Sequence, residues 1–141
     1  MGERAALGEM TNWVSRPRGP GLKVLLAALS EIGVVIKGSS FDAIELSQPG
    51  QLDFSDSVAV RAALPTMTFI EIKTINQERA AVDFAGSFFA LTEGEIAASD
   101  LLGARHRVVL YDKRTGNLLV TSVPEIVARA KSTNWQLSVQ L

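Results

Sequence analysis

The sequence predicts one α/β domain built around a mixed β-sheet. Apolar residues recur with helical spacing in some segments and with period 2 in others, in the order helix, several strands, helix, hairpin, helix, strand. The chain has 141 residues, enough for one domain with a real core but few for two. Its composition, 47% apolar and 21% charged, is typical of globular proteins. We expect a flexible lead-in over 1–20, with a short helix over 3–14, and a single domain over 21–141.

The first half of the domain is predicted to contain a helix followed by three strands. The helix ends at Gly33, and its apolar face carries Leu22, Leu25, Leu26, Leu29 and Ile32. A short strand is expected in VVIKGSS, from residue 34, and a second in FDAIEL, residues 41–46. The turn formers in SQPGQLDFSDS then take the chain out of the sheet, and VAVRAALPTM brings it back. Met67–Ile75 is the strongest strand pattern in the chain.

The second half is predicted to contain two capped helices around a hairpin. Residues 76–87 fit a helix or a loop equally well. A capping box at Thr92 and Glu95 starts a helix that Gly103 closes. Strands over 105–111 and 117–123 are joined by DKRTG.

A second capping box follows the hairpin. It is formed by Ser122 and Glu125, with Pro124 at the first helical position. The chain ends in a predicted strand whose alternating apolar face carries Trp135, Leu137, Val139 and Leu141.

Composition excludes several kinds of site. There are no cysteines, so disulfides, zinc thiolates and cysteine nucleophiles are ruled out. The single histidine, His106, argues against histidine-based metal sites and is expected on a strand surface. A net charge of −1 gives no overall basic character, so a nucleic-acid partner would need a local basic patch. We see no targeting signal and no membrane-length apolar stretch, and expect a cytoplasmic protein.

The stretch TFIEIKTI, residues 68–75, places an acid and an amine on one face of a strand that is otherwise apolar. Burial of a charge costs several kcal/mol unless the charge is paired or binds a cation. Asp42, on a neighbouring strand, could join Glu71 in holding a divalent cation, with Lys73 orienting an attacking water. The alternative is a solvated Glu71–Lys73 pair at a strand end, with Asp42 an ordinary turn acid.

These residues resemble the PD-(D/E)xK nuclease superfamily. A leading apolar helix, FDAI and FIEIKT follow the order of that family over roughly residues 21–123. The stretch FFALTEGEIAASDLLGARHRVVLYD is similar to the nuclease-like domain at the C-terminus of the plant NO VEIN protein and in bacterial defence proteins. The resemblance implies a restriction-endonuclease-like core, a central mixed sheet flanked by helices, and Mg²⁺- or Mn²⁺-dependent endonuclease activity on DNA.

The resemblance also implies roles for individual residues. Asp42, Glu71 and the backbone carbonyl of Ile72 would hold the metal, Lys73 would be the catalytic amine, and Gln77 would take a polar catalytic role. The sequence departs from the family pattern in having Phe41 where the motif has proline. The long stretch between the two acids also contains two rival first acids, and of these Asp56 is preferred to Asp53.

Basic residues on the predicted hairpin are candidates for DNA contacts. These are Arg105, Arg107, Lys113 and Arg114; a solvated, charged hairpin edge is the alternative. SRPRG at 15–19 is either a DNA-binding arm or a plain leader.

Three functions remain open at this point: a nuclease of restriction, phage defence or repair, a catalytically silent nuclease-fold module binding DNA or protein, and a small α/β protein without a nucleic-acid role. The slightly acidic net charge favours the silent module, whereas the paired Glu71 and Lys73 favour the nuclease. A homodimer or a larger defence complex is compatible with each.

Overall fold

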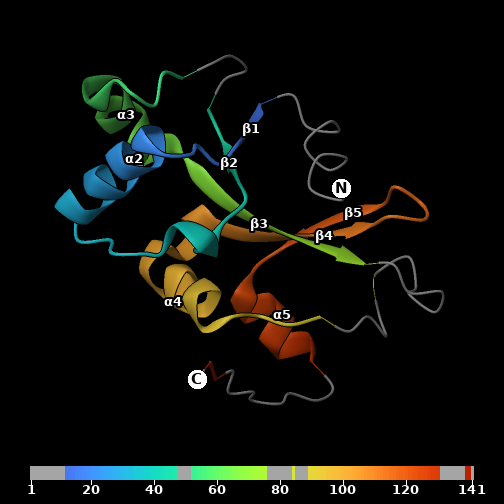
Figure 1. The fold of residues 1–141 in the computed structure, drawn as a ribbon. Coiled ribbons are helices and arrows are strands. Elements are labelled where there is room, and N and C mark those ends of the chain that lie inside the picture. Colours follow the sequence, from blue (N-terminus) through green and yellow to red (C-terminus); the bar gives the residue numbers. More distant parts are fainter. Residues whose placement is uncertain (1–11, 48–51, 76–83, 85–88, 131–138, 141) are drawn as a thin grey trace.

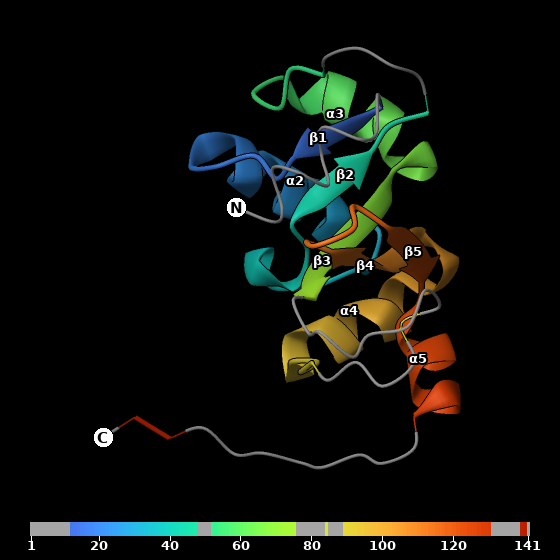
Figure 2. The same ribbon diagram turned by 90° about the vertical axis from the view of Figure 1, so that its right-hand side faces the viewer.

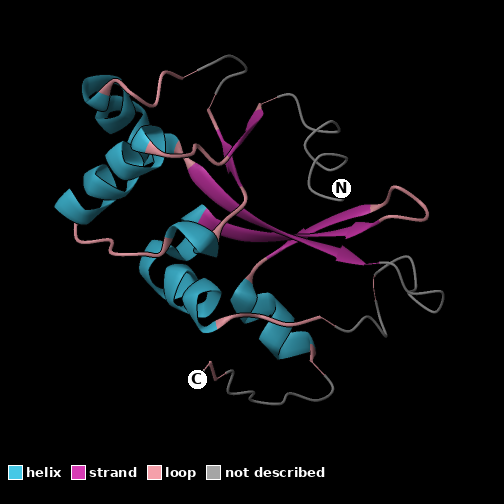
Figure 3. Cartoon of the chain, in the orientation of Figure 1, coloured by secondary structure: helices cyan, strands magenta, loops and turns pink. Residues whose placement is uncertain are grey.

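The computed structural model describes residues 12–47, 52–75, 84, 89–130 and 139–140, which form an α/β domain with a five-stranded mixed sheet and four helices (Figures 1 and 3). The strands are β1 (Trp13–Ser15), β2 (Ala43–Glu45), β3 (Thr68–Ile75), β4 (His106–Asp112) and β5 (Leu118–Thr121). The helices are α2 (Pro20–Glu31), α3 (Ser57–Ala63), α4 (Glu93–Leu102) and α5 (Val123–Arg129). Single 3-10 turns are η1 (Gly38–Ser40), η2 (Leu64–Thr66) and η3 (Gly103–Arg105).

The strands lie in sequence order, β1-β2-β3-β4-β5. All neighbouring pairs are antiparallel except β3 and β4, which run parallel. A parallel pair needs a crossover connection, and the one between β3 and β4 includes α4. Strand β3, which carries Glu71 and Lys73, is therefore the central strand of the sheet and is connected to β4 through helix α4.

The described helices pack on one face of the sheet (Figure 2). Ile44 and Phe69 of the strands join residues of α2, α3 and α4 in one core cluster. Val108 and Leu110 of β4 join residues of α4 and α5 in another. The opposite face has its own buried cluster, to which no described helix contributes: Trp13, Ala43, Ile70, Ile72, Val109 and Tyr111. Alternation along β3 therefore directs Glu71 and Lys73 toward the helices.

Several local predictions are confirmed. Gly33 follows the last turn of α2 with φ +85°, and Gly103 caps α4 with φ +59°, the left-handed region that glycine enters without a Cβ penalty. The capping box of Thr92 and Glu95 is present in both directions. The hairpin strands are also found, at 106–112 and 118–121.

Other predictions are corrected. The lead-in predicted over 1–20 overlaps the sheet, because Trp13 is buried and β1 pairs with β2. The short strand expected from residue 34 is a loop in which the side chain of Val35 is 71% exposed. The return of the chain to the sheet, to which the sequence assigns no particular element, runs through helix α3 (Ser57–Ala63), whose N-cap is the side chain of Asp56. His106 is fully buried, because its side chain lies on the helix-covered face beside Phe69.

Some predicted elements lie outside the described residues. These are most of the helix over 3–14, nearly all of the ambiguous segment 76–87 and most of the C-terminal strand, of which 139–140 are described and lack regular structure. None of the helices in the described ranges is long and apolar enough to cross a membrane.

Candidate active site on strand β3

Lys73 lies between two glutamates under the first turn of α4. Its Nζ is 2.9 and 3.0 Å from the two carboxylate oxygens of Glu95 and 3.6 Å from Oε1 of Glu71. All three side chains are largely withdrawn from solvent, with exposed fractions of 16% for Lys73, 7% for Glu71 and 4% for Glu95. The pair that the sequence placed side by side on β3 is therefore a buried cluster with a third member.

Glu95 has two tasks in this cluster. Its Oε1 accepts from the backbone N–H of Thr92 at 2.9 Å and so closes the capping box of α4. The same carboxylate accepts the Lys73 ammonium from the sheet below. The T-x-x-E pattern identified the cap, but the contact with Lys73 depends on α4 packing over β3, for which no local sequence signal exists.

Asp42 lies beside the same stretch of β3. It immediately precedes β2, and its backbone N–H donates to the carbonyl of Ile70 at 2.7 Å. Its Oδ2 accepts the backbone N–H of Ile72 at 2.8 Å. Because the N–H and C=O of one residue in a strand point to the same edge, the Ile72 carbonyl lies on the side of Asp42. The charge of Asp42 also acts on Glu71. The structure thus brings together Asp42, Glu71, Ile72 and Lys73.

The rival acids have other partners. Asp56 accepts the backbone N–H groups of Val58 and Ala59 as the N-cap of α3. Asp53 accepts from the backbone and hydroxyl groups of Ser55 in a turn. Each carboxylate therefore has a local structural role, and only Asp42 shares the surroundings of Glu71.

The cluster has more negative than positive groups. Burial, followed by hydrogen bonding to Glu95 and the charges of Asp42 and Glu95, raises the pKa of Glu71 to about 10, against the opposing effect of Lys73. Burial also acts to raise the pKa of Glu95, but hydrogen bonds from Glu71, Lys73 and Thr92 hold it below its usual value. The proton of this carboxyl pair therefore belongs on Glu71. Its Oε2 is buried and has no hydrogen-bond partner among the described residues.

The basic residues predicted to bind DNA do not form one cluster. Arg105 donates to the carbonyls of Leu64 and Met67, so its guanidinium holds the turn before β3. Arg107 pairs with Glu125 at 3.5 Å. It is also in register with Ile70, and alternation puts it on the face opposite Glu71. Neither arginine is placed as expected for a DNA contact at this site.

Lys113 and Arg114 lie at the other end of β4, exposed in the hairpin turn. The backbone N–H of Lys113 donates to the carbonyl of Ile75 at 3.0 Å, which places Lys113 near the end of β3 that carries Lys73. Arg114 approaches Asp112 at 3.7 Å. Lys113 follows Arg105 by eight positions, which corresponds to roughly 25 Å along a strand. Gln77 lies outside the described residues.

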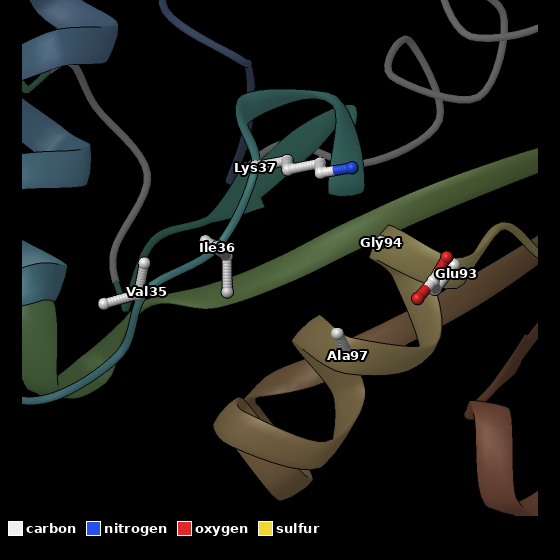
Figure 4. Close-up of a pocket in the computed structure, with 6 residues that line it drawn as sticks. All are labelled: Val35, Ile36, Lys37, Glu93, Gly94 and Ala97. Atoms are coloured by element: carbon white, nitrogen blue, oxygen red, sulfur yellow. The ribbon is translucent and has the colours of Figure 1, made fainter.

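An open groove of about 340 Å³ adjoins the first turn of α4 (Figure 4). Val35, Ile36 and Lys37 form one wall, and Glu93, Gly94 and Ala97 form the other. None of Asp42, Glu71 and Lys73 lines this groove. We place the candidate site at the charged cluster instead, because its groups can bind a cation or move a proton.

The donor set is incomplete for a metal site made of side chains alone. Across the described ranges, no three His, Asp or Glu side chains are arranged to hold a metal ion. Two carboxylates and a backbone carbonyl nevertheless form an oxygen-only set, which is the preference of Mg²⁺ and Mn²⁺, and Mg²⁺ usually completes its shell with water and substrate phosphate. The unpartnered oxygen of Glu71 fits such a cation.

Comparison with known proteins finds no family model, no curated protein and no solved structure that matches this chain. What the chain does must therefore be inferred from the side chains gathered around β3.

Proposed function

We propose that this chain is a divalent-metal-dependent nuclease domain of the PD-(D/E)xK type, hydrolysing DNA phosphodiester bonds in restriction, phage defence or repair. The five-stranded mixed sheet with its helices is compatible with a restriction-endonuclease-like core. The placement of Asp42 beside the strand that carries Glu71 and Lys73 supports the same assignment.

The observation that carries the proposal is the buried Oε2 of Glu71, which has no hydrogen-bond partner in the part of the chain that the structure describes. Buried polar atoms in folded proteins are nearly always hydrogen-bonded, and an exception calls for an explanation. Here it occurs where Glu71 and Glu95 flank the single ammonium group of Lys73, and where the charge of Asp42 also acts on Glu71. A divalent cation would give the oxygen a partner and offset the excess negative charge.

Asp42, Glu71 and the carbonyl of Ile72 would hold this cation. When bound, a divalent cation polarises a phosphoryl oxygen and lowers the pKa of a coordinated water. Lys73 would donate a hydrogen bond to the attacking water or to a non-bridging phosphate oxygen. Glu95 would fix the direction of the Lys73 ammonium, because two of its contacts with Lys73 are within 3.0 Å.

Calorimetry with Mn²⁺ and nicking of supercoiled plasmid in Mg²⁺ test the proposal together. We expect one Mn²⁺ per chain and metal-dependent nicking, with both lost in Glu71→Gln. Glu93→Gln is the matched control, since Glu93 is an exposed glutamate of the same helical turn as Glu95. Wild-type protein that binds no Mn²⁺ and nicks no DNA would contradict the proposal.

A specific observation favours a second candidate, a catalytically silent nuclease-fold module. Lys73 is already paired with Glu95, and two predicted DNA contacts, Arg105 and Arg107, are engaged within the domain. Such a module would bind DNA or protein equally well with Ca²⁺ and with chelator. A nuclease site should bind DNA more tightly with Ca²⁺, because the cation offsets the carboxylates near the phosphate.

A further inference from the structure

The turn that leads into Asp42 is held by Arg16, which follows β1. Nη1 of Arg16 donates to the carbonyls of Gly38 and Phe41 at 2.9 and 2.8 Å. The backbone N–H of Arg16 donates to the carbonyl of Asp42 at 2.9 Å. One residue therefore holds both ends of the segment 38–42.

Two further contacts hold the segment from its inner side. Nε2 of the buried His106 is 3.2 Å from the carbonyl of Ser40. The ring of Phe41, also fully buried, packs edge-to-face on Phe69 of β3, with ring centroids 5.1 Å apart. The segment is thus anchored to β3 and β4 on one side and to Arg16 on the other. Asp42 is the first residue after these anchors.

We propose that Arg16 is a positioning residue that places the Asp42 carboxylate beside Ile72, where it can bind the cation. This inference rests on the proposed function. Arginine suits the task because its planar guanidinium presents donors in a fixed fork, whereas a lysine ammonium is a point charge on a flexible stem. Arg16, in the basic stretch SRPRG, is thereby assigned to the site and not to a DNA-binding arm.

Hydrogen exchange at the Ile72 amide tests the placement of Asp42 without any metal. That amide donates to Oδ2 of Asp42. We expect its exchange to be about fivefold faster in Arg16→Lys, the factor that corresponds to the loss of one net hydrogen bond of about 1 kcal/mol. Arg18→Lys is the matched control, because Arg18 is an exposed arginine two residues away. Unchanged protection of the Ile72 amide in Arg16→Lys would overturn the inference.

Mn²⁺ affinity tests whether this placement matters for the cation. Removal of a residue that orients a metal ligand typically costs about 10- to 100-fold in affinity, and we expect a loss in this range for Arg16→Lys. Arg18→Lys should bind as wild type does. If Arg16→Lys only damages the fold, its melting temperature in chelator should fall. If Arg16 positions Asp42, Mn²⁺ affinity should fall while the melting temperature in chelator stays unchanged. Wild-type affinity in a folded Arg16→Lys would contradict the role.

Failure of the proposed function and failure of the inference about Arg16 can be told apart. If wild-type protein binds no Mn²⁺, the proposed function fails, and the Ile72 amide still decides whether Arg16 places Asp42. If Arg16→Lys does not fold, the wild-type protein supplies the measurement by NMR. The guanidinium of Arg16 should then show hindered rotation and slowly exchanging Nη protons, and that of Arg18 should show averaged signals. Averaged signals for both arginines would overturn the inference.

Discussion

Two helices of this domain begin with the same local pattern, and their glutamates have opposite fates. Glu95 follows Thr92 by three residues at the start of α4, and Glu125 follows Ser122 by three at the start of α5. The side chain of Glu95 is 4% exposed and is bound to Lys73, whereas that of Glu125 is 59% exposed and lies 3.5 Å from Arg107.

The difference comes from where each helix lies on the sheet. The start of α4 covers the face of the central strand β3 that carries Glu71 and Lys73, so that Glu95 both closes its capping box and binds the half-buried Lys73. Helix α5 follows β5 at the edge of the sheet, where Glu125 accepts instead from the hydroxyl of Thr121 at 3.2 Å. A capping motif therefore determines where a helix starts, but the packing of that helix decides whether the acid becomes part of a site.

Replacement of the basic residue in each ion pair, Lys73 beside Glu95 and Arg107 beside Glu125, should give the largest difference in stability. Loss of one partner from a buried ion pair costs about 3–5 kcal/mol, and we expect Lys73→Met to lose stability at the low end of this range, because Glu71 carries a proton and only Glu95 loses a close charged partner. Arg107→Met should lose under about 1 kcal/mol, as is usual for exposed pairs. Urea unfolding at neutral pH measures both.

The same two variants separate catalysis from stability. Lys73→Met should abolish plasmid nicking, and Arg107→Met should retain it, since Arg107 lies on the opposite sheet face. Lys73→Met should lose stability as well as nicking, because Lys73 lies between two glutamates and its side chain is largely withdrawn from solvent. Equal stability of the two variants would mean that Lys73 contributes no more to the stability of the fold than the more exposed Arg107.

Replacement of the two glutamates by glutamine should give a smaller difference in stability, again with the larger loss at α4. In Glu95→Gln the amide oxygen can still accept from Thr92, so the cap persists while the charged partner of Lys73 is lost. We expect a cost of about 1–2 kcal/mol, within the range for hydrogen bonds to charged groups. Glu125→Gln should stay within about 0.5 kcal/mol, as for most surface substitutions. Thermal unfolding of both variants decides, and a larger loss in Glu125→Gln would contradict the comparison.

Much of the fold follows from local signals in the sequence. The helix stops at Gly33 and Gly103 need only the glycine preference for positive φ, and β3 needs only its run of β-branched residues. The strand expected from residue 34 is wrong because two valines and an isoleucine fit a strand in isolation, whereas none of the described strands pairs with them. β1 was not predicted because its three residues, which lie between turn formers, are too few to show a period-2 alternation.

The site was predictable only in part. Glu71 and Lys73 were visible because charges interrupt an apolar strand, and Asp42 because it precedes a neighbouring strand. Glu95, Arg16 and His106 reach the site through contacts across 22 residues or more, and each looked ordinary in its own segment. Long-range packing, which periodicity does not encode, brings these three residues to the site.

The pH dependence of stability should distinguish the two glutamates through His106. Burial lowers the pKa of His106, against the hydrogen bond to Ser40 and the charge of Glu95. The unfolded chain therefore takes up a proton first, and stability is lost as pH falls below about 6.5, at up to about 1.4 kcal/mol per pH unit until the lower folded pKa is passed. His106→Gln should remove this loss, while its amide nitrogen can still donate to Ser40.

Unfolding in urea between about pH 5 and about pH 8 measures this loss. Glu95→Gln should deepen it, because the nearby negative charge that favours the protonated imidazole is gone. Glu125 is not among the charges acting on His106, so Glu125→Gln should leave the profile as it is. Identical profiles for wild type and His106→Gln would show that His106 does not titrate differently on folding.

The smallest expected effect concerns the salt dependence of DNA binding. Arg107 is paired with Glu125 and lies on the face away from Glu71, whereas Lys113 is exposed at the end of β3 that carries Lys73. Each phosphate contact contributes about −0.9 to the slope of log affinity against log salt on duplex DNA. We therefore expect Lys113→Gln to make the slope shallower by about 0.9, and Arg107→Gln to leave it unchanged. Titration of a labelled duplex with Ca²⁺ across a salt series measures both slopes. If Arg107→Gln changes the slope as much as Lys113→Gln does, then DNA must compete with Glu125 for Arg107, and the exposed capping glutamate would have a functional role of its own.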